Sequence, residues 1–193
     1  MLPTYVIYIT LFTSLIGIFS YIRSIVKGNT RPNLASWFMW FLAPMVASLV
    51  GFVSGAGVAI LPVFLAGFGP LLVLVFSLFY KNSFWKLSKI DYLCLALSLS
   101  ALACWFIWHE GVLAVIFAIL ADGIAYVPTY IKSWKNPETE NPWPYGIGIF
   151  NYILGLLVLP ELTFLTAGFG FYLIVGNSIE ISIISFRRRN KKI

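Results

Sequence analysis

An acidic residue stands inside one of the most apolar stretches of this chain. Asp122 lies in a run that extends from about 112 to 131, and Tyr126 and Thr129 follow it at positions i+4 and i+7. Because this spacing places the three side chains on one face of a helix, it predicts a polar stripe. The carboxylate can accept a hydrogen bond from a ligand, take up a proton, or tie the helix to a neighbour as a structural contact. Ionisable residues inside apolar spans are functional by default, so we expect Asp122 to serve a ligand or a proton.

Other polar and aromatic side chains within the apolar runs suit the binding of a small solute. Asn side chains donate and accept hydrogen bonds, which fits sugar hydroxyls, amides or carboxylates, although the same groups also tie helices together. Aromatic rings deep in a helix can stack on a ligand, whereas Trp37 and Trp143, at the starts of two runs, are expected to anchor the chain at a membrane interface. The predicted substrate-binding residues are Asp122, Tyr126, Asn151, Asn177, Trp40 and Tyr21.

The loop that follows the Asp122 run is charged. Lys132 stands at the end of the run, and Glu138 and Glu140 lie in the loop itself. Opposite charges at this spacing predict a gate of ion pairs that closes one end of a cavity. Loop charges are also commonly just solvated, and an exposed pair contributes only about 0–1 kcal/mol, so a solvated loop is the alternative.

The sequence does not predict catalysis. An active site requires a nucleophile, a base or a metal at compatible positions, and no second acid stands beside Asp122. Cys94 and Cys104 are ten residues apart on one run, a spacing that is not typical of metal ligands, and His109 has only Glu110 beside it. We therefore expect no enzyme activity, no metal site and no cofactor.

The composition is that of a membrane protein. Of the 193 residues, 60% are apolar and 10% are charged, and the mean hydropathy is +0.91. A bilayer-spanning helix needs about 20 mostly apolar residues. The chain contains such runs near 3–22, 34–54, 57–80, 90–108, 112–131, 143–160 and 163–185. The predicted fold is therefore an all-α membrane protein with seven transmembrane helices.

The positive charges all lie on one side of this seven-span arrangement. The 13 Lys and Arg residues follow the first, third, fifth and seventh runs, whereas the intervening segments hold only His109, Glu110 and Glu161. Because Lys and Arg are retained on the cytoplasmic side, we expect a multi-pass protein of the cell membrane with its amino terminus outside and its carboxyl terminus in the cytoplasm. The net charge of +6 therefore does not indicate nucleic acid, and the tail 187–193 is expected to attract anionic lipids.

The chain contains the same plan twice. Three residue pairs are related by a shift of 105 positions: Tyr21 with Tyr126, Lys27 with Lys132, and Pro32 with Pro137. The tetrapeptide AGFG also occurs twice, at 66–69 and 167–170. Three runs, one unrepeated run and three runs predict two parallel triple-helix bundles joined by a linker helix, a 3+1+3 plan used by transporters. The predicted divisions are 1–80, the linker 81–109, 110–186 and the basic tail 187–193.

These residues resemble the PQ-loop superfamily, which includes the SWEET and SemiSWEET sugar transporters. That family repeats a helix ending in Pro-Gln and a basic loop with Lys-Ser, and the segment 128–133 of this chain is similar, with Thr129 where the family has Gln. Asn151 falls where the family often has Asn. The resemblance covers nearly the whole chain, and it implies that Pro44 and Pro128 act as hinges.

Together these features predict a transporter that moves a small polar solute, sugar-like or a similar metabolite, by alternating access through a central cavity. The alternative is a membrane receptor or interaction protein that binds its ligand in the same pocket without transport. The expected partners are the solute and the lipid bilayer, with no nucleic acid, and the sequence leaves open whether the chain forms a homo-oligomer.

Overall fold

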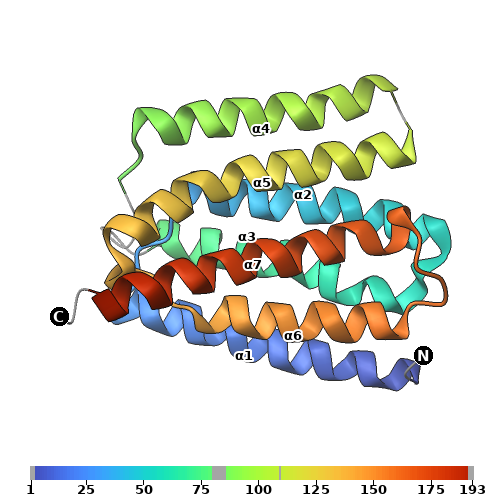
Figure 1. The fold of residues 1–193 in the computed structure, drawn as a ribbon, viewed down its shortest axis with the longest axis horizontal. Coiled ribbons are helices and arrows are strands. Elements are labelled where there is room, and N and C mark those ends of the chain that lie inside the picture. The colour runs from blue at the N-terminus through green and yellow to red at the C-terminus, as the bar shows by residue number, and fades with distance from the viewer. Residues whose placement is uncertain (1–2, 80–85, 109, 191–193) are drawn as a thin grey trace.

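The computed structural model describes residues 3–79, 86–108 and 110–190, and every regular element in these ranges is helical (Figure 1). The prediction of an all-α fold is therefore confirmed. The α-helices are α1 (Ile7–Val26), α2 (Leu34–Gly51), α3 (Leu61–Phe79), α4 (Lys89–Trp108), α5 (Gly111–Lys135), α6 (Trp143–Val158) and α7 (Phe164–Asn190). Short helical turns occupy Thr4–Val6, Phe52–Ala56, Gly57–Ile60 and Pro137–Thr139.

Local sequence explains where several of these helices begin and end. The side chain of Asn33 accepts hydrogen bonds from the backbone N–H groups of Ala35 and Ser36, at 3.1 and 3.3 Å, and so caps the start of α2. Between α2 and α3 the chain turns at Gly55 and Gly57, whose φ angles are +93° and +55°. Because only glycine adopts such angles readily, these two positions separate α2 from α3.

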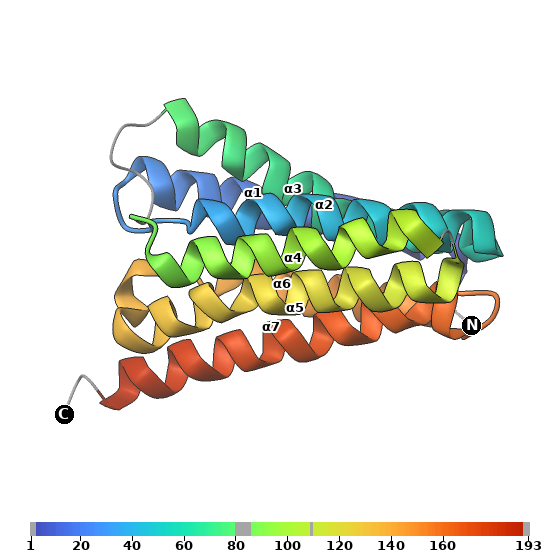
Figure 2. The same ribbon diagram turned by 90° about the horizontal axis from the view of Figure 1, so that it is seen from above.

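The helices run side by side along one common axis, with the two ends of the chain at opposite ends of the bundle (Figures 1 and 2). Helix α3 packs against α1 and α2, and α7 packs against α5 and α6. The two triplets meet where α1 packs against α6 and α2 packs against α5, and α4 lies on α5 and α2. Four buried alanines of α5 allow close approach of its neighbours: Ala114, Ala118, Ala121 and Ala125.

The surface of the bundle has the character of a membrane protein. Within the described ranges, four helical stretches are long and apolar enough to cross a membrane, namely Ile7–Val26, Leu34–Phe79, Gly111–Lys135 and Phe164–Asn190, and the 16-residue helix α6 is also apolar. Large apolar side chains face outward on several helices, including Phe12, Phe19, Leu78 and Phe186, a pattern typical of lipid contact. The arrangement of seven spans in a 3+1+3 plan stays a prediction.

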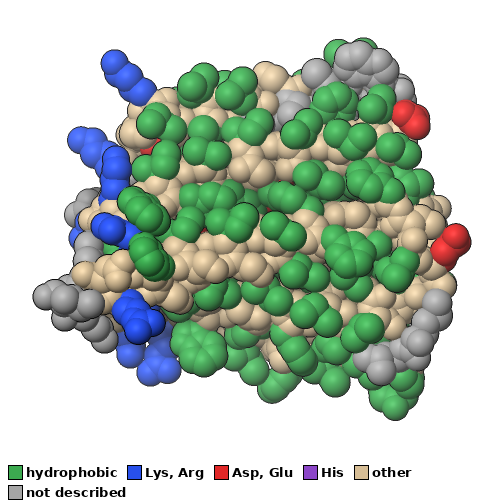
Figure 3. Space-filling model, in the orientation of Figure 1, with side chains coloured by type: hydrophobic (Ala, Val, Ile, Leu, Met, Phe, Trp, Pro, Cys, Tyr) green, Lys and Arg blue, Asp and Glu red, His purple; other side chains and the backbone are tan. Residues whose placement is uncertain are grey.

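Charged side chains lie at the two ends of this apolar bundle. Figure 3 shows Lys and Arg side chains gathered at the end where the carboxyl terminus lies, with acidic side chains at the opposite end. The predicted segregation of positive charge concerns 13 residues, of which Lys81, Lys191 and Lys192 lie outside the described residues.

Candidate functional site

A cavity of about 110 Å³ lies within the bundle, between helices of both triplets. All six residues that the sequence predicts to bind substrate line it, together with the predicted hinge residue Pro44. Its wall is formed by α1, α2, α3, α5, α6 and α7, so residues that are far apart in the sequence converge on one volume. The space is sufficient for several waters or a small organic solute.

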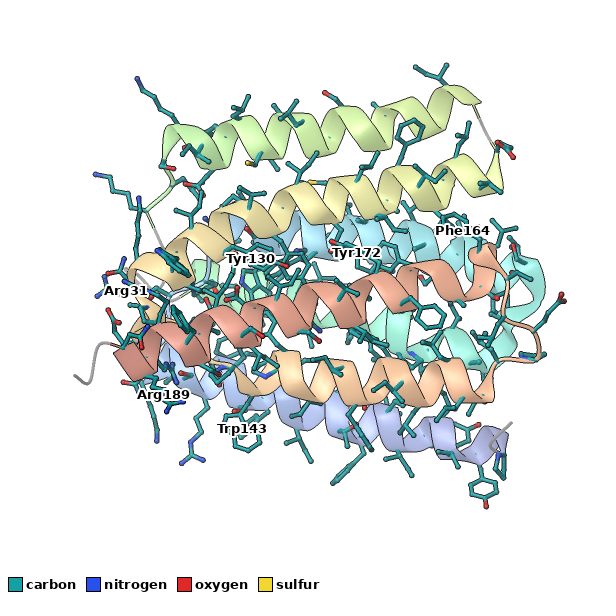
Figure 4. All side chains as sticks on the ribbon, in the orientation of Figure 1. Arg31, Tyr130, Trp143, Phe164, Tyr172 and Arg189 are labelled. Carbon is teal, nitrogen blue, oxygen red and sulfur yellow. The ribbon has the colours of Figure 1, made fainter. Side chains whose placement is uncertain are left out.

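Asp122 is the acidic group of this cavity. Its side chain is fully buried, and its Oδ2 accepts a hydrogen bond of 2.9 Å from the hydroxyl of Tyr172 on α7. Its other oxygen, Oδ1, has no hydrogen-bond partner among the described residues. Figure 4 shows Tyr172 and Tyr130 between α5 and α7, where the Tyr130 hydroxyl donates to the carbonyl of Gly176 at 2.9 Å. A buried carboxylate oxygen without a donor is an acceptor that a ligand can use.

Aromatic rings form a connected wall around the cavity. The ring centroids of Tyr21 and Trp37 are 4.5 Å apart, and those of Trp37 and Trp40 are 5.5 Å apart. Trp40 lies 4.7 Å from Tyr126 and 6.3 Å from Tyr145. Within the described part of the chain, the Trp40 indole N–H has no acceptor, whereas the Trp37 indole N–H lies close to the Tyr21 hydroxyl. The wall therefore offers aromatic faces and one unpaired indole N–H.

The expectation that Trp37 anchors the chain at the membrane interface is wrong. Trp37 is only 6% exposed and lines the cavity, whereas Trp143 is 70% exposed, and Figure 4 shows it pointing away from the bundle at the start of α6. The position of both residues at the start of a helix could not separate these roles. Their difference arises because α2 lies inside the bundle, in contact with α5 and α3.

Both predicted asparagines line the cavity, and each also bonds to protein groups. Asn177 accepts a hydrogen bond of 2.5 Å from the hydroxyl of Tyr126. Asn151 accepts from Thr13 at 2.5 Å and donates to the Ser14 hydroxyl at 2.8 Å, which ties α6 to α1. The structure thus gives Asn151 the helix-tying contacts that the sequence left open, without removing it from the cavity wall.

A buried ion pair lies at the end of the bundle that carries the Lys and Arg residues. Lys132 bonds to Glu140, and the two side chains are 1% and 0% exposed. Lys132 also donates to the carbonyl of Arg31 at 2.8 Å, and the Tyr21 hydroxyl donates to Glu140 at 2.6 Å. Glu138, the third residue of the predicted gate, is exposed. Of the three residues of the predicted gate, Lys132 and Glu140 form the buried contact, and the gate itself stays a prediction.

Further contacts hold this loop in place. Arg188 on α7 donates to the carbonyls of Glu140 and Pro137, at 2.6 and 3.1 Å. Next to the ion pair, Ser133 donates to Glu180, a fully buried acid on α7. Because Glu140 and Glu180 both lie near Lys132, these residues form a compact polar cluster, not a solvated loop, and the cavity residues Tyr21 and Tyr145 bond to it.

The predicted hinge Pro128 is buried within α5 but does not line the cavity. Proline has no backbone N–H, so the carbonyl of Ile124 loses its helical partner. One residue further on, the carbonyl of Ala125 accepts a hydrogen bond of 2.6 Å from Ser36 on α2, and Thr129 donates to the Ser36 hydroxyl at 3.1 Å. The sequence did not indicate Ser36, which links the two triplets at this proline.

No three His, Cys, Asp or Glu residues gather as a possible metal site within the described ranges. His109 lies outside them.

No protein-family model, no curated protein and no solved structure matches this chain. The site is therefore interpreted from its own geometry: a largely aromatic cavity with one acid, beside a buried ion pair.

Proposed function

We propose that this chain is a membrane transporter that moves a small polar solute by alternating access. In this proposal α1–α3 and α5–α7 are two parallel triple-helix bundles, and α4 is the linker. The observation that carries the proposal is the position of the cavity: it lies between the two triplets, and the hydroxyls of Tyr21 and Tyr145 in its wall donate to Glu140 of a buried ion pair. A site at the interface between repeats is the usual plan of transporters built from internal repeats.

The packing of the helices supports two equivalent halves. In each triplet the third helix packs against the first and the second, and the most extensive contacts between triplets are α1 with α6 and α5 with α2. Exchanging each helix for its counterpart, α1 for α5 and α2 for α6, turns one of these contacts into the other. This pattern is compatible with the resemblance to the PQ-loop superfamily, in which rocking of the halves opens the cavity to either side.

The polar cluster around Lys132 is the gate in this proposal. Lys132 and Glu140 belong to the second triplet and its loop, whereas Tyr21 and the Arg31 carbonyl belong to the first. Separation of the triplets at this end requires these hydrogen bonds to break. The cluster therefore holds the cavity closed on its side, and ligand binding must supply the difference in free energy that opens it.

The basic end is placed in the cytoplasm, since Lys and Arg are retained there. A hollow of about 460 Å³ at this end is lined by Arg23, Lys27, Arg188 and Trp143, together with Glu138 and Glu140. Three cations beside an exposed Trp suit the headgroup region of anionic lipids, the partner predicted for the basic tail.

The topology can be tested at the two ends of α5. Gly111→Cys and Lys135→Cys, each made in a chain with Cys94→Ala and Cys104→Ala, are expected to react with an impermeant thiol reagent from opposite faces of a sealed vesicle. The reason is length: 25 residues of helix span about 37 Å, more than the hydrocarbon core of about 30 Å. Reaction of both cysteines from the same face contradicts the seven-span arrangement.

The hinge can be tested at Pro128. Pro128→Ala restores the backbone donor that α5 lacks, so the helix stiffens, and we expect the transport rate to fall several-fold while the affinity for the solute is unchanged. The measurement is uptake into proteoliposomes beside equilibrium binding. Val127→Ala, one residue away, removes side-chain atoms without changing the backbone and is the matched control. A parallel loss of binding and uptake makes Pro128 a structural residue.

Uptake also separates the transporter from the alternative, a receptor that binds the same ligand. Proteoliposomes are screened with radiolabelled sugars, nucleosides, vitamins, amino acids and amines. Saturable uptake that requires the reconstituted protein supports transport, whereas binding of a solute without uptake supports the receptor.

A further inference from the structure

We propose that the central cavity selects an organic cation, a small amine or quaternary ammonium compound that also carries an oxygen acceptor, with Asp122 as its counter-ion. This inference deepens the proposed function by naming the class of solute. Only the statement that the cation is carried across the membrane rests on the proposed function. Selective binding of the cation is a property of the cavity and does not depend on transport.

The first argument is the free oxygen of Asp122. The carboxylate is fully buried, and the Tyr172 hydroxyl occupies only Oδ2. No donor of the described residues reaches Oδ1. Burying a charged group without compensation is costly, and a ligand that brings a positive charge compensates it most completely.

The second argument is the charge of the surroundings. None of the described residues that line the cavity is Lys or Arg. Lys132 is already bonded to Glu140. The position that corresponds to Asp122 in the first half of the chain is Gly17, which also lines the cavity. The cavity therefore has one acid on one side, and an anionic solute would meet repulsion there.

The third argument is the aromatic wall. Trp40 packs between Trp37 and Tyr126, with ring centroids 5.5 and 4.7 Å away. The negative faces of such rings attract a cation, and tryptophan does so most strongly. A sugar could also stack on these rings, but it would bring no positive charge to pair with Asp122. Rings and carboxylate together favour the cation.

The fourth argument concerns the rest of the ligand. The indole N–H of Trp40 is buried, and the described residues provide no acceptor for it. A hydroxyl, carbonyl or ether oxygen on the ligand satisfies it. The preferred solute thus carries its positive charge toward Asp122 and an oxygen toward the Trp40 indole.

The test compares ligands of equal shape and different charge. Choline and its neutral carbon analogue 3,3-dimethyl-1-butanol form one pair, and protonated 2-phenoxyethylamine and 2-phenoxyethanol, which both carry an ether oxygen, form the second. Binding to the purified protein in lipid nanodiscs is measured by titration calorimetry at neutral pH. We expect at least one cation to bind tenfold to a hundredfold more tightly than its neutral partner, the range for a hydrogen bond to a charged group. D-glucose is expected to bind more weakly than that cation.

Two variants test whether Asp122 causes the preference for the cation over its neutral partner. Asp122→Asn keeps the shape of the side chain and is expected to reduce the preference for the cation to near onefold. Glu161→Gln removes a negative charge from an exposed loop and should leave the preference unchanged. Since Asp122→Asn could also fold poorly, the comparison of the paired ligands on the unmodified protein stands without it.

Three results overturn the inference: a neutral ligand or D-glucose that binds as tightly as the cations, absence of cation binding at millimolar concentration, or an unchanged preference in a folded Asp122→Asn protein. The proposed function fails separately. Preferential binding of the cation without uptake contradicts the proposed transport but agrees with the proposed selectivity. Uptake of a neutral solute without any preference for cations contradicts the selectivity but agrees with transport.

Discussion

Replacing Glu140 with Gln is expected to lower the free energy of unfolding by about 3–5 kcal/mol. The carboxylate is fully buried against Lys132, so its removal takes away the ion-pair partner of a buried positive charge. Gln retains an oxygen that can accept from the Tyr21 hydroxyl, which lies 2.6 Å from the carboxylate. The decrease in the free energy of unfolding therefore measures mainly the loss of the ion pair between Lys132 and Glu140. The measurement is reversible unfolding by sodium dodecyl sulfate in mixed micelles, followed by helical circular dichroism.

The same chain provides a matched control and a rescue. Glu138→Gln is the same substitution two residues away, at an exposed position, and should change the free energy of unfolding by less than about 1 kcal/mol. Adding Lys132→Met to Glu140→Gln removes the orphaned charge and should restore most of the lost stability. Equal effects of the two Gln substitutions, or a double variant no more stable than Glu140→Gln, would contradict a buried, coupled ion pair.

The sequence predicted the fold class because the relevant signal is local. Apolar runs of membrane-spanning length give helices whatever their partners, and the loops that separate them contain the Lys and Arg residues. The six predicted binding residues converge on one cavity for a related reason. A polar side chain in an apolar run has to turn away from lipid, so a three- to four-residue spacing indicates the inward face of each helix.

The contacts between helices could not be predicted in this way, because they depend on which helices become neighbours. Trp37 lines the cavity only because α2 packs between α3 and α5. Tyr172 donates to Asp122 from α7, and Ser36 donates to the Ala125 carbonyl from α2, across 50 and 89 residues of sequence. Nothing in the local pattern around these three residues distinguishes them from ordinary helix positions.

The repeated AGFG tetrapeptide also shows that contacts between helices cannot be predicted from the local sequence. Gly67 and Gly168 occupy equivalent positions in the two AGFG segments, at 66–69 and 167–170. A Cβ atom on Gly67 would lie 2.9 Å from the backbone carbonyl oxygen of Phe41 in α2, whereas one on Gly168 would meet the Phe164 ring of its own helix at 3.0 Å. The sequence similarity is real, but only the first glycine allows two different helices to approach each other.

Gly67→Ala is therefore expected to lower the free energy of unfolding by about 1–3 kcal/mol, the usual cost of overpacking. Besides the Phe41 carbonyl, the added methyl would lie 2.9 Å from Met45, so α2 and α3 must separate beside the cavity. Gly146→Ala is the control, since its nearest neighbour is the Ile181 side chain at 3.8 Å; there alanine should be neutral or stabilise the helix. Unfolding in mixed micelles measures both variants. If Gly67→Ala is as stable as the unmodified protein, α2 and α3 do not pack through this glycine.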